Sequence, residues 1–131
     1  MTCRRPDRRR PSRRAVQLEL PLIVPELPST VRAALRAAVV EDWAKDAACT
    51  SQFVDPDWWT APDRDPDQDT ARTVCQSCPA RRSCLAHALV TAEQDGIWGG
   101  ASPDERVWMR LFLADGAPVP VVLDQDFSAV A

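Results

Sequence analysis

Four cysteines in the middle of the chain constrain its fold more than any other feature of the sequence. Cys49 is followed by Cys75, Cys78 and Cys84 in a Cys-x2-Cys-x5-Cys pattern, whereas Cys3 lies far away among arginines and is not expected to take part. Four thiolates gathered from a short chain suit a soft metal centre, either a tetrahedral zinc ion or an iron–sulfur cluster. Scattered buried thiols in an apolar core are the less specific alternative.

The composition leaves room for one small domain. Of the 131 residues, twelve are proline and only three are phenylalanine. We expect residues 29–116 to form the domain, residues 1–28 to be a disordered Arg/Pro-rich arm, and residues 117–131 to be a disordered tail of acidic and apolar residues. Because so small a domain buries little apolar surface, metal binding and folding are expected to be coupled.

Charge is divided unevenly along the chain. Residues 1–14 contain seven arginines and one aspartate, whereas the remaining residues carry a net charge of −9. Such an arm is either a disordered segment or a contact for nucleic acid, and the sequence does not separate the two. The candidate contacts are Arg8, Arg9, Arg10, Arg13 and Arg14.

No apolar run in the sequence approaches the roughly 18 residues of a membrane span. Ser12-Arg13-Arg14 is weakly similar to a twin-arginine export signal, but Glu19, Pro21 and Pro25 interrupt the apolar stretch that should follow. We therefore expect a cytoplasmic protein without membrane contact, whose cysteines bind metal or do redox work rather than form structural disulfides.

Helix signals occur at four places, and no segment makes a convincing strand. The predicted helices cover about 29–43, 67–78, 79–95 and 103–115. Gly96 is expected to cap the third helix, and Ser102 with Glu105 forms a capping box for the fourth. The expected core face of the fourth helix carries Val107, Trp108, Leu111 and Phe112. The sequence therefore predicts an all-α bundle of about four short helices around the metal centre.

Other aromatic and apolar residues have less specific interpretations. Trp43 and Trp108 lie on apolar stripes of their helices and are expected in the core. Trp58 and Trp59 are neighbours in an acidic loop, so we expect one beside the metal centre and one toward a partner. Val119–Leu123 has the composition of a strand, but a lone strand would have no pairing partner.

The surroundings of the cysteines favour a metal without choosing which one. Cys78 lies at the start of a predicted helix, where partial positive charge stabilises thiolates, and Arg72, Arg81 and Arg82 would offset further negative charge. His87 could replace Cys49 in a Cys3His zinc site, although a histidine on the helix surface is the preferred interpretation. A redox disulfide between Cys75 and Cys78 is another alternative, but the βαβ pattern of thioredoxins is missing.

Gly96-Ile97-Trp98-Gly99-Gly100 predicts a tight turn between two helices, with an exposed tryptophan between residues that lack side chains. Tryptophan is a frequent anchor at protein interfaces, so Trp98 is a candidate partner contact. Alternatively, Trp98 covers the metal centre of its own chain, and the two roles are compatible.

Together, the four cysteines and this turn resemble the WhiB-like proteins of actinobacteria, over about residues 40–112. The resemblance implies a small helical protein that holds a [4Fe–4S] cluster on Cys49, Cys75, Cys78 and Cys84 and responds to oxygen or nitric oxide. It further implies a transcriptional regulator, not an enzyme, that binds the C-terminal region of the primary sigma factor of RNA polymerase.

The resemblance assigns the sigma-factor contact to the glycine–tryptophan turn and to aromatic residues before the Cys-x2-Cys pair. In this chain these residues are Gly96, Ile97, Trp98, Gly99, Gly100, Trp58 and Trp59. Many family members carry a basic C-terminal segment that contacts DNA, but here no lysine or arginine follows Arg110, so direct DNA binding by this end is not expected.

Two other functions remain open at this point. One is a structural zinc module that mediates contacts with protein or nucleic acid, and the other is a protein disulfide reductase that uses Cys75 and Cys78. Nothing in the sequence indicates a small-molecule substrate.

Overall fold

The computed structural model describes residues 26–125. The expectations for the arginine-rich arm, its candidate DNA contacts and Cys3 therefore lie outside the described residues.

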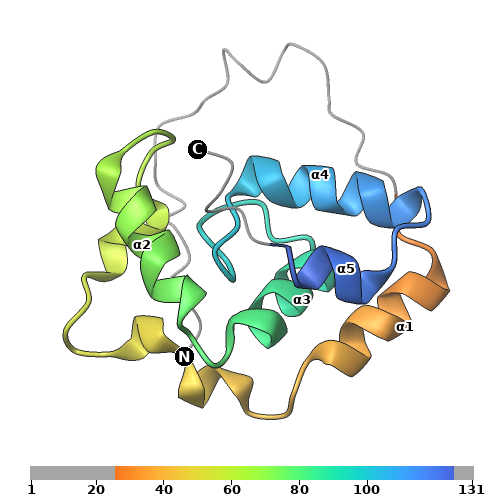
Figure 1. Ribbon diagram of the computed structural model, residues 1–131, viewed down its shortest axis with the longest axis horizontal. Helices are drawn as coiled ribbons and strands as arrows, with labels where there is room; N and C mark the ends of the chain where they lie inside the picture. The colour runs from red at the N-terminus through yellow and green to blue at the C-terminus, as the bar shows by residue number, and fades with distance from the viewer. Residues whose placement is uncertain (1–25, 126–131) are drawn as a thin grey trace.

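The described part of the chain is helical, as the sequence predicts (Figure 1). It contains five α-helices rather than four, three 3-10 helices and no β-strand. The α-helices are α1 (Ser29–Ala38), α2 (Pro66–Gln76), α3 (Arg81–Thr91), α4 (Pro103–Ala114) and α5 (Val119–Leu123), and the 3-10 helices are η1 (Trp43–Asp46), η2 (Ala48–Thr50) and η3 (Pro56–Thr60). Among these residues, no helix has the length and apolar character that crossing a membrane requires.

Local capping explains where several helices begin and end. The carboxylate of Asp65 accepts a hydrogen bond from the backbone N–H of Asp67 at 2.8 Å, which starts α2. The predicted capping box of α4 is confirmed, since the hydroxyl of Ser102 accepts from the N–H of Glu105 at 3.2 Å. The predicted cap at Gly96 is wrong, because α3 already ends at Thr91 and is capped by Ala92, which has a left-handed φ of 54°.

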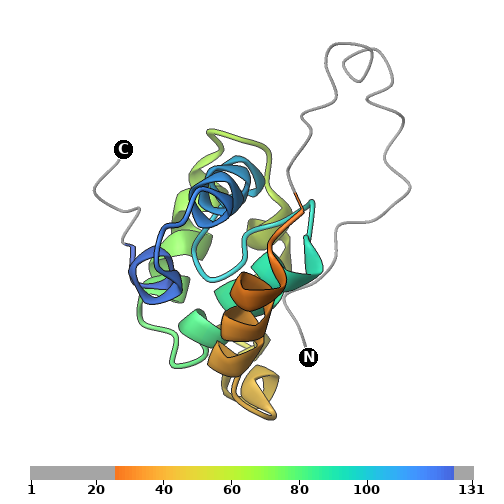
Figure 2. The same ribbon diagram turned by 90° about the vertical axis from the view of Figure 1, so that its right-hand side faces the viewer.

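The main apolar core lies between α1, α3, α4 and α5 (Figures 1 and 2). Its buried side chains are Leu27, Leu35, Leu85, Ala86, Leu89, Ala101, Met109, Leu113, Val122 and Leu123. On the other side of α3, α2 packs against η2 and η3 and forms a second cluster with Trp59, Ala71, Cys75 and Ile97. Helix α3 therefore stands between the apolar bundle and the cysteine-bearing segments.

Residues 117–125 belong to the packed structure. Val119–Leu123 is the helix α5, so the strand considered for it is wrong. A helix pairs its own backbone groups, whereas a lone strand would leave them without partners. Val122 and Leu123 are buried in the main core, which places the end of the described chain against α3 and α4.

Helix α4 buries a different face from the one that its sequence predicts. Arg106, Met109 and Leu113 point inward, whereas Trp108 is 61% and Phe112 49% exposed. The helix is apolar on both sides, and periodicity alone does not choose between two such faces. Trp108 is therefore not a core residue, while Trp43 is half-buried against Cys84, Ala88 and Trp98.

Candidate metal centre

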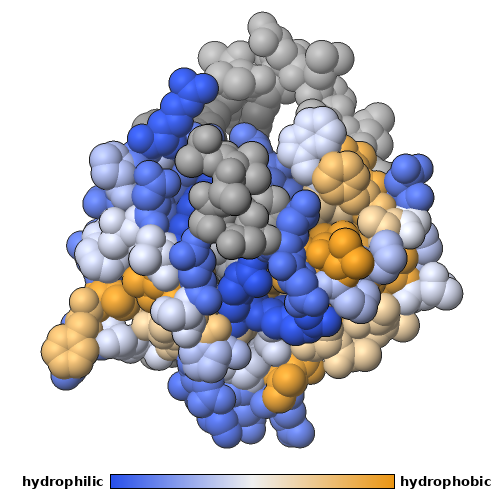
Figure 3. Space-filling model, viewed as in Figure 1, coloured by the Kyte–Doolittle hydropathy of each residue, from blue (hydrophilic) through white to orange (hydrophobic). Residues whose placement is uncertain are grey.

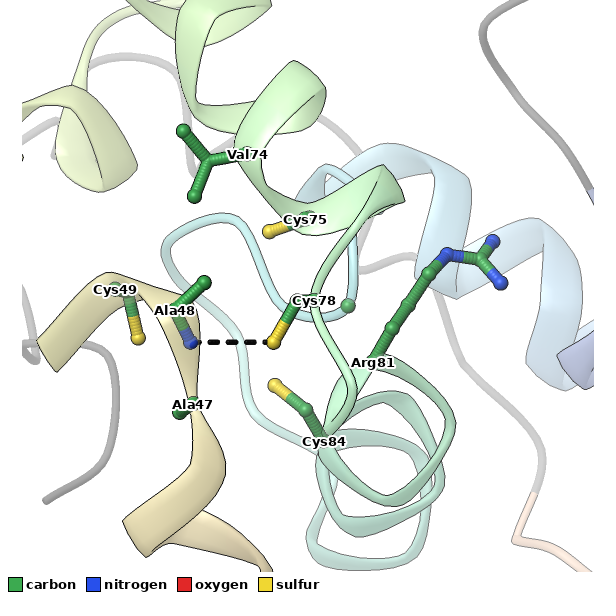
Figure 4. Close-up of a pocket in the computed structure, with 9 residues that line it drawn as sticks. Ala47, Ala48, Cys49, Val74, Cys75, Cys78, Arg81 and Cys84 are labelled. Carbon is green, nitrogen blue, oxygen red and sulfur yellow. Dashed lines mark hydrogen bonds between the residues drawn. The ribbon is translucent and has the colours of Figure 1, made fainter. Parts of the chain in front are cut away.

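The four cysteines predicted as ligands line one pocket (Figure 4). Cys49 comes from η2, Cys75 from the last turn of α2, Cys78 from the loop after α2, and Cys84 from the second turn of α3. The remaining lining residues are Ala47, Ala48, Val74, Arg81 and Gly99. The distant segment η2 and the continuous stretch 75–84 thus bring their thiols to a single place.

Burial divides the thiols into two pairs. Cys75 and Cys84 are each 5% exposed, and Cys49 and Cys78 are half-buried. The first pair forms the floor of the pocket on α2 and α3, and the second pair lies toward solvent. A group held here would be largely shielded by protein and reachable from one side.

Backbone and indole N–H groups are directed at the sulfurs. The N–H of Ala48 donates to Cys78 Sγ at 3.3 Å, and Trp59 Nε1 donates to Cys75 Sγ at 3.4 Å. Burial raises the pKa of the Cys75 thiol, although Trp59 and the backbone of Gly100 act in the opposite direction by hydrogen bonding to the sulfur. A bound cation would supply the charge that a buried thiolate needs, and the N–H donors would then stabilise it.

Four cysteine sulfurs in one pocket are a donor set that suits either a zinc ion or an iron–sulfur cluster. Four sulfurs on one zinc ion would lie about 3.8 Å apart, given Zn–S bonds of about 2.3 Å in a tetrahedron. In an iron–sulfur cluster each thiolate binds a different iron, so the sulfurs are held farther apart.

His87 is not among the residues that line the pocket. Its ring lies between two tryptophans, with centroids 5.6 Å from Trp43 and 5.9 Å from Trp98. The histidine therefore packs beside the site, which leaves the Cys3His alternative without support from its position.

The glycine–tryptophan turn closes the pocket from the side of α3. At Gly99, where φ is +56°, a Cβ atom would lie 2.7 Å from Leu85 Cβ and 2.8 Å from the carbonyl oxygen of Arg81. Those distances leave no room for a side chain, so this position needs glycine. A Cβ at Gly100 would be 3.5 Å from Cys75 Cβ, which places the turn directly against the ligand segment.

Trp98 is 3% exposed, so the predicted exposed tryptophan is wrong. Its Nε1 donates to the carbonyl of Asp95 at 2.9 Å, and its ring packs with Cys84 and Ala88. The turn is too tight to project the ring outward, and the ring covers Cys84 instead. This position agrees with the alternative in which Trp98 shields the site of its own chain.

Of the two adjacent tryptophans, one lies beside a pocket cysteine and the other is partly exposed. Trp59 is 1% exposed and lies beside Cys75, and its carbonyl accepts from the N–H of Ile97 at 2.8 Å. Trp58 is half-buried, and its ring stacks on that of Trp59 with centroids 6.2 Å apart. Of the predicted partner contacts with side chains, Trp58 is therefore the one that keeps substantial exposed surface.

Arg106 organises the turn, and sequence reasoning missed it. Its side chain is buried and donates to the carbonyls of Gly96 and Ala101 at 2.7 Å each, and to those of Glu93 and Asp95 at 3.2 Å each. Burial lowers the pKa of Arg106 to about 10, so the guanidinium stays charged near neutral pH. The sequence feature that could have predicted this role is spacing, because Arg106 precedes Met109 by three residues on a helix face that is otherwise apolar.

The three arginines expected near the centre have different roles. Only Arg81 lines the pocket, and its guanidinium points away from the sulfurs (Figure 4) and donates to the carbonyls of Leu123 and Gln125 at 3.4 and 2.7 Å. Arg72 pairs with Glu105 and Arg82 pairs with Asp124. Helix α5 is thus connected to the wall of the pocket.

Comparison with known proteins places these features in one family. A family model described as transcription factor WhiB matches residues 43–109. The transcriptional regulator WhiD of Streptomyces coelicolor is 41% identical over 69 residues, which cover 50% of this chain and 62% of WhiD. The probable transcriptional regulator WhiB7 of Mycobacterium tuberculosis is 51% identical over 51 residues, or 39% of this chain and 54% of WhiB7.

The redox-responsive transcriptional regulator WhiB3 of Mycolicibacterium smegmatis is 37% identical over 73 residues, which cover 53% of this chain and 76% of WhiB3. The chain thus spans less than two thirds of WhiD and of WhiB7. The family model covers about half of the chain and includes all four pocket cysteines and the whole glycine–tryptophan turn. The chain therefore belongs to the WhiB family.

Proposed function

We propose that this chain is a [4Fe–4S] transcriptional regulator that acts through the C-terminal region of the primary sigma factor of RNA polymerase. The single observation that supports it most is the convergence of Cys49, Cys75, Cys78 and Cys84 on one pocket. These four thiolates would hold the cluster. A bound cluster would be the part of the protein that reacts with oxygen or nitric oxide.

The chain contributes support and shielding for these ligands. Trp59 and Ala48 donate hydrogen bonds to two of the sulfurs, and Trp98 packs over a third at Cys84. The four ligands tie η2 to α2 and α3, so the loss of the bound group would release η2 from the rest of the domain. The surface around the pocket would then change with the state of the centre.

That surface is the proposed contact for the sigma factor. The half-buried ring of Trp58 stacks on Trp59 beside the pocket, and the turn 96–100 forms the adjoining backbone. Because Trp98 is buried, we propose that it acts by holding the turn rather than by direct contact. The name of the relative WhiB3 describes a redox-responsive transcriptional regulator, which supports the same kind of role here.

Direct contact with DNA is the weaker part of this function. The described residues after Arg110 contain Asp115 and Asp124 and no basic residue, and phosphates would be repelled by them. Any DNA contact would then depend on the arginines of residues 4–14. We also propose a cytoplasmic location, as expected for a protein that binds RNA polymerase.

The first test is chemical analysis of protein isolated without air. We expect iron and acid-labile sulfide in equal amounts and an absorption band near ~400–420 nm, as for thiolate-bound clusters. Replacement of Cys75 or Cys84 by alanine should abolish the band, whereas Cys3→Ala should not. One zinc ion without sulfide would instead support the zinc module, and insulin reduction that requires Cys75 and Cys78 would support the reductase.

The second test measures binding to the isolated sigma-factor region. Trp58→Ala should weaken binding by about 2 kcal/mol if this ring is an anchor of the interface, and the iron content should not change. Unchanged affinity, with the cluster intact, would place the sigma-factor contact elsewhere.

A further inference from the structure

Helix α4 carries a second apolar face that no described element covers. Val107, Trp108, Leu111 and Phe112 follow one another at helical spacing on the side opposite Met109. Trp108 and Phe112 are 61% and 49% exposed, and their ring centroids are 6.4 Å apart. Val107 and Leu111 are half-buried.

The apolar surface continues onto α5. Val121 is 64% exposed, and α5 packs directly against α4. Figure 3 shows apolar side chains gathered over these two helices, on the right of the view. We name this surface, which consists of Val107, Trp108, Leu111, Phe112 and Val121, the α4–α5 face.

The fold does not require this face to be apolar. Arg106, Met109 and Leu113 already bind α4 to the core, and none of the five residues of the α4–α5 face lines the cysteine pocket. Contiguous exposed apolar side chains are unfavourable in water and commonly mark a site of interaction. The face is therefore a candidate contact that is separate from the proposed sigma-factor surface.

The edges of the face are acidic. Asp104 and Asp115 are exposed at the two ends of α4, about 16 Å apart at 1.5 Å per residue. No lysine or arginine follows Arg110 in the chain, and the guanidinium of Arg110 donates to the carbonyl of Leu89. A complementary partner would present apolar side chains with positive charges beyond both ends.

This charge pattern disfavours two other occupants. In an antiparallel pair of two copies, Asp104 of one chain would lie opposite Asp115 of the other, and like charges would repel. A nucleic acid would be repelled by both carboxylates. We propose that the α4–α5 face binds an amphipathic helix of another protein, in which lysine or arginine residues about eleven positions apart border the apolar side.

The test uses the full chain, isolated without air, and two fluorescein-labelled synthetic helices as probes. Both probes have the same leucine face, and they carry either lysine or glutamate at two positions eleven residues apart. We expect the lysine probe to bind at least about tenfold more tightly than the glutamate probe at low salt, by fluorescence anisotropy. Asp104→Lys together with Asp115→Lys should reverse this preference.

Variants of the face separate this site from nonspecific adhesion. Trp108→Ala together with Phe112→Ala should weaken binding of the lysine probe at least about tenfold, because both rings would be lost as anchors. Phe53→Ala is the matched control, since Phe53 is 84% exposed but lies outside the face. It should leave binding unchanged. Circular dichroism and iron content should be the same for all these variants.

Three results would overturn the proposal. The first is absence of binding, or equal binding of the two probes. The second is a dimer in sedimentation experiments that the Trp108→Ala change dissociates, which would assign the face to a second copy. The third is at least tenfold tighter probe binding after deletion of residues 1–25, which would assign the face to that segment.

Discussion

Arg106 should contribute more to stability than any exposed arginine, because it alone supports the turn beside the cysteine pocket with four hydrogen bonds from one buried guanidinium. Four bonds of a charged donor, at about 1.5 kcal/mol each, give about 6 kcal/mol. The free-energy cost of burying the charged guanidinium opposes this stabilisation. Lowering the pKa from 12.5 to about 10 corresponds to about 3 kcal/mol. We therefore expect Arg106→Met to cost about 3 kcal/mol.

The assay is thermal unfolding of the metal-loaded protein under anaerobic conditions, followed by circular dichroism. For a domain of this size, about 3 kcal/mol corresponds to a fall in Tm of about 12 °C or more. The near-ultraviolet spectrum should also change, because Trp98 packs within the turn that Arg106 holds. Arg36→Met is the matched control, since Arg36 is exposed on α1 and its replacement should stay within about 0.5 kcal/mol. A fall in Tm no larger for Arg106→Met than for Arg36→Met would refute the reasoning.

Three further substitutions test other parts of the structure. Gly99→Ala should lower the free energy of unfolding by about 3 kcal/mol or more, because the added methyl would lie 2.8 Å from a backbone oxygen. Gly116→Ala is the control: there is open space around this residue, so the change should cost only about 1 kcal/mol for the positive φ. Equal losses in chemical unfolding would contradict this reasoning. Trp59→Phe removes the N–H donor to the sulfur of Cys75 and should lower the midpoint potential of the bound centre in anaerobic redox titration; an unchanged potential would show that this bond does not tune it. Leu123→Ala should cost about 2–4 kcal/mol in the same unfolding experiment, since this side chain is fully buried in the main core, and a loss under about 1 kcal/mol would mean that α5 contributes little.

Local signals were sufficient for much of the fold. The cap at Ser102 and the proline at position 103 are short-range features, so the start of α4 could be predicted from sequence, whereas the cap of α2 at Asp65 was not predicted and α2 begins at Pro66, one residue before the predicted start. Helix α1 ends earlier than predicted, at Ala38, because Val39 is extended, and η1 begins only after Asp42, which adopts a left-handed conformation. Such a break depends on how the chain packs, and the apolar stripe continued through it.

The features that sequence could not supply depend on tertiary contacts. The inward face of α4 is decided by hydrogen bonds between Arg106 and the carbonyl groups of residues 93–101. The hydrophobic periodicity of α4 carries no information about these carbonyl groups. Trp98 was expected at the surface because its neighbours are glycines, yet Gly99 instead brings the turn so close to α3 that the ring is covered. The convergence of the cysteines was suggested by spacing, but the hydrogen bonds from Trp59 and Ala48 appear only in three dimensions.

The position of Arg81 has a practical consequence for experiments on this protein. The residue lines the pocket while its guanidinium holds the carbonyls of Leu123 and Gln125, so the end of the described chain is attached to the wall of the cysteine site. A truncation before Leu123 would remove both acceptors of the Arg81 guanidinium. Assays of metal retention should accordingly use protein that keeps the residues up to Gln125, because shortened chains would change the wall of the pocket along with the tail.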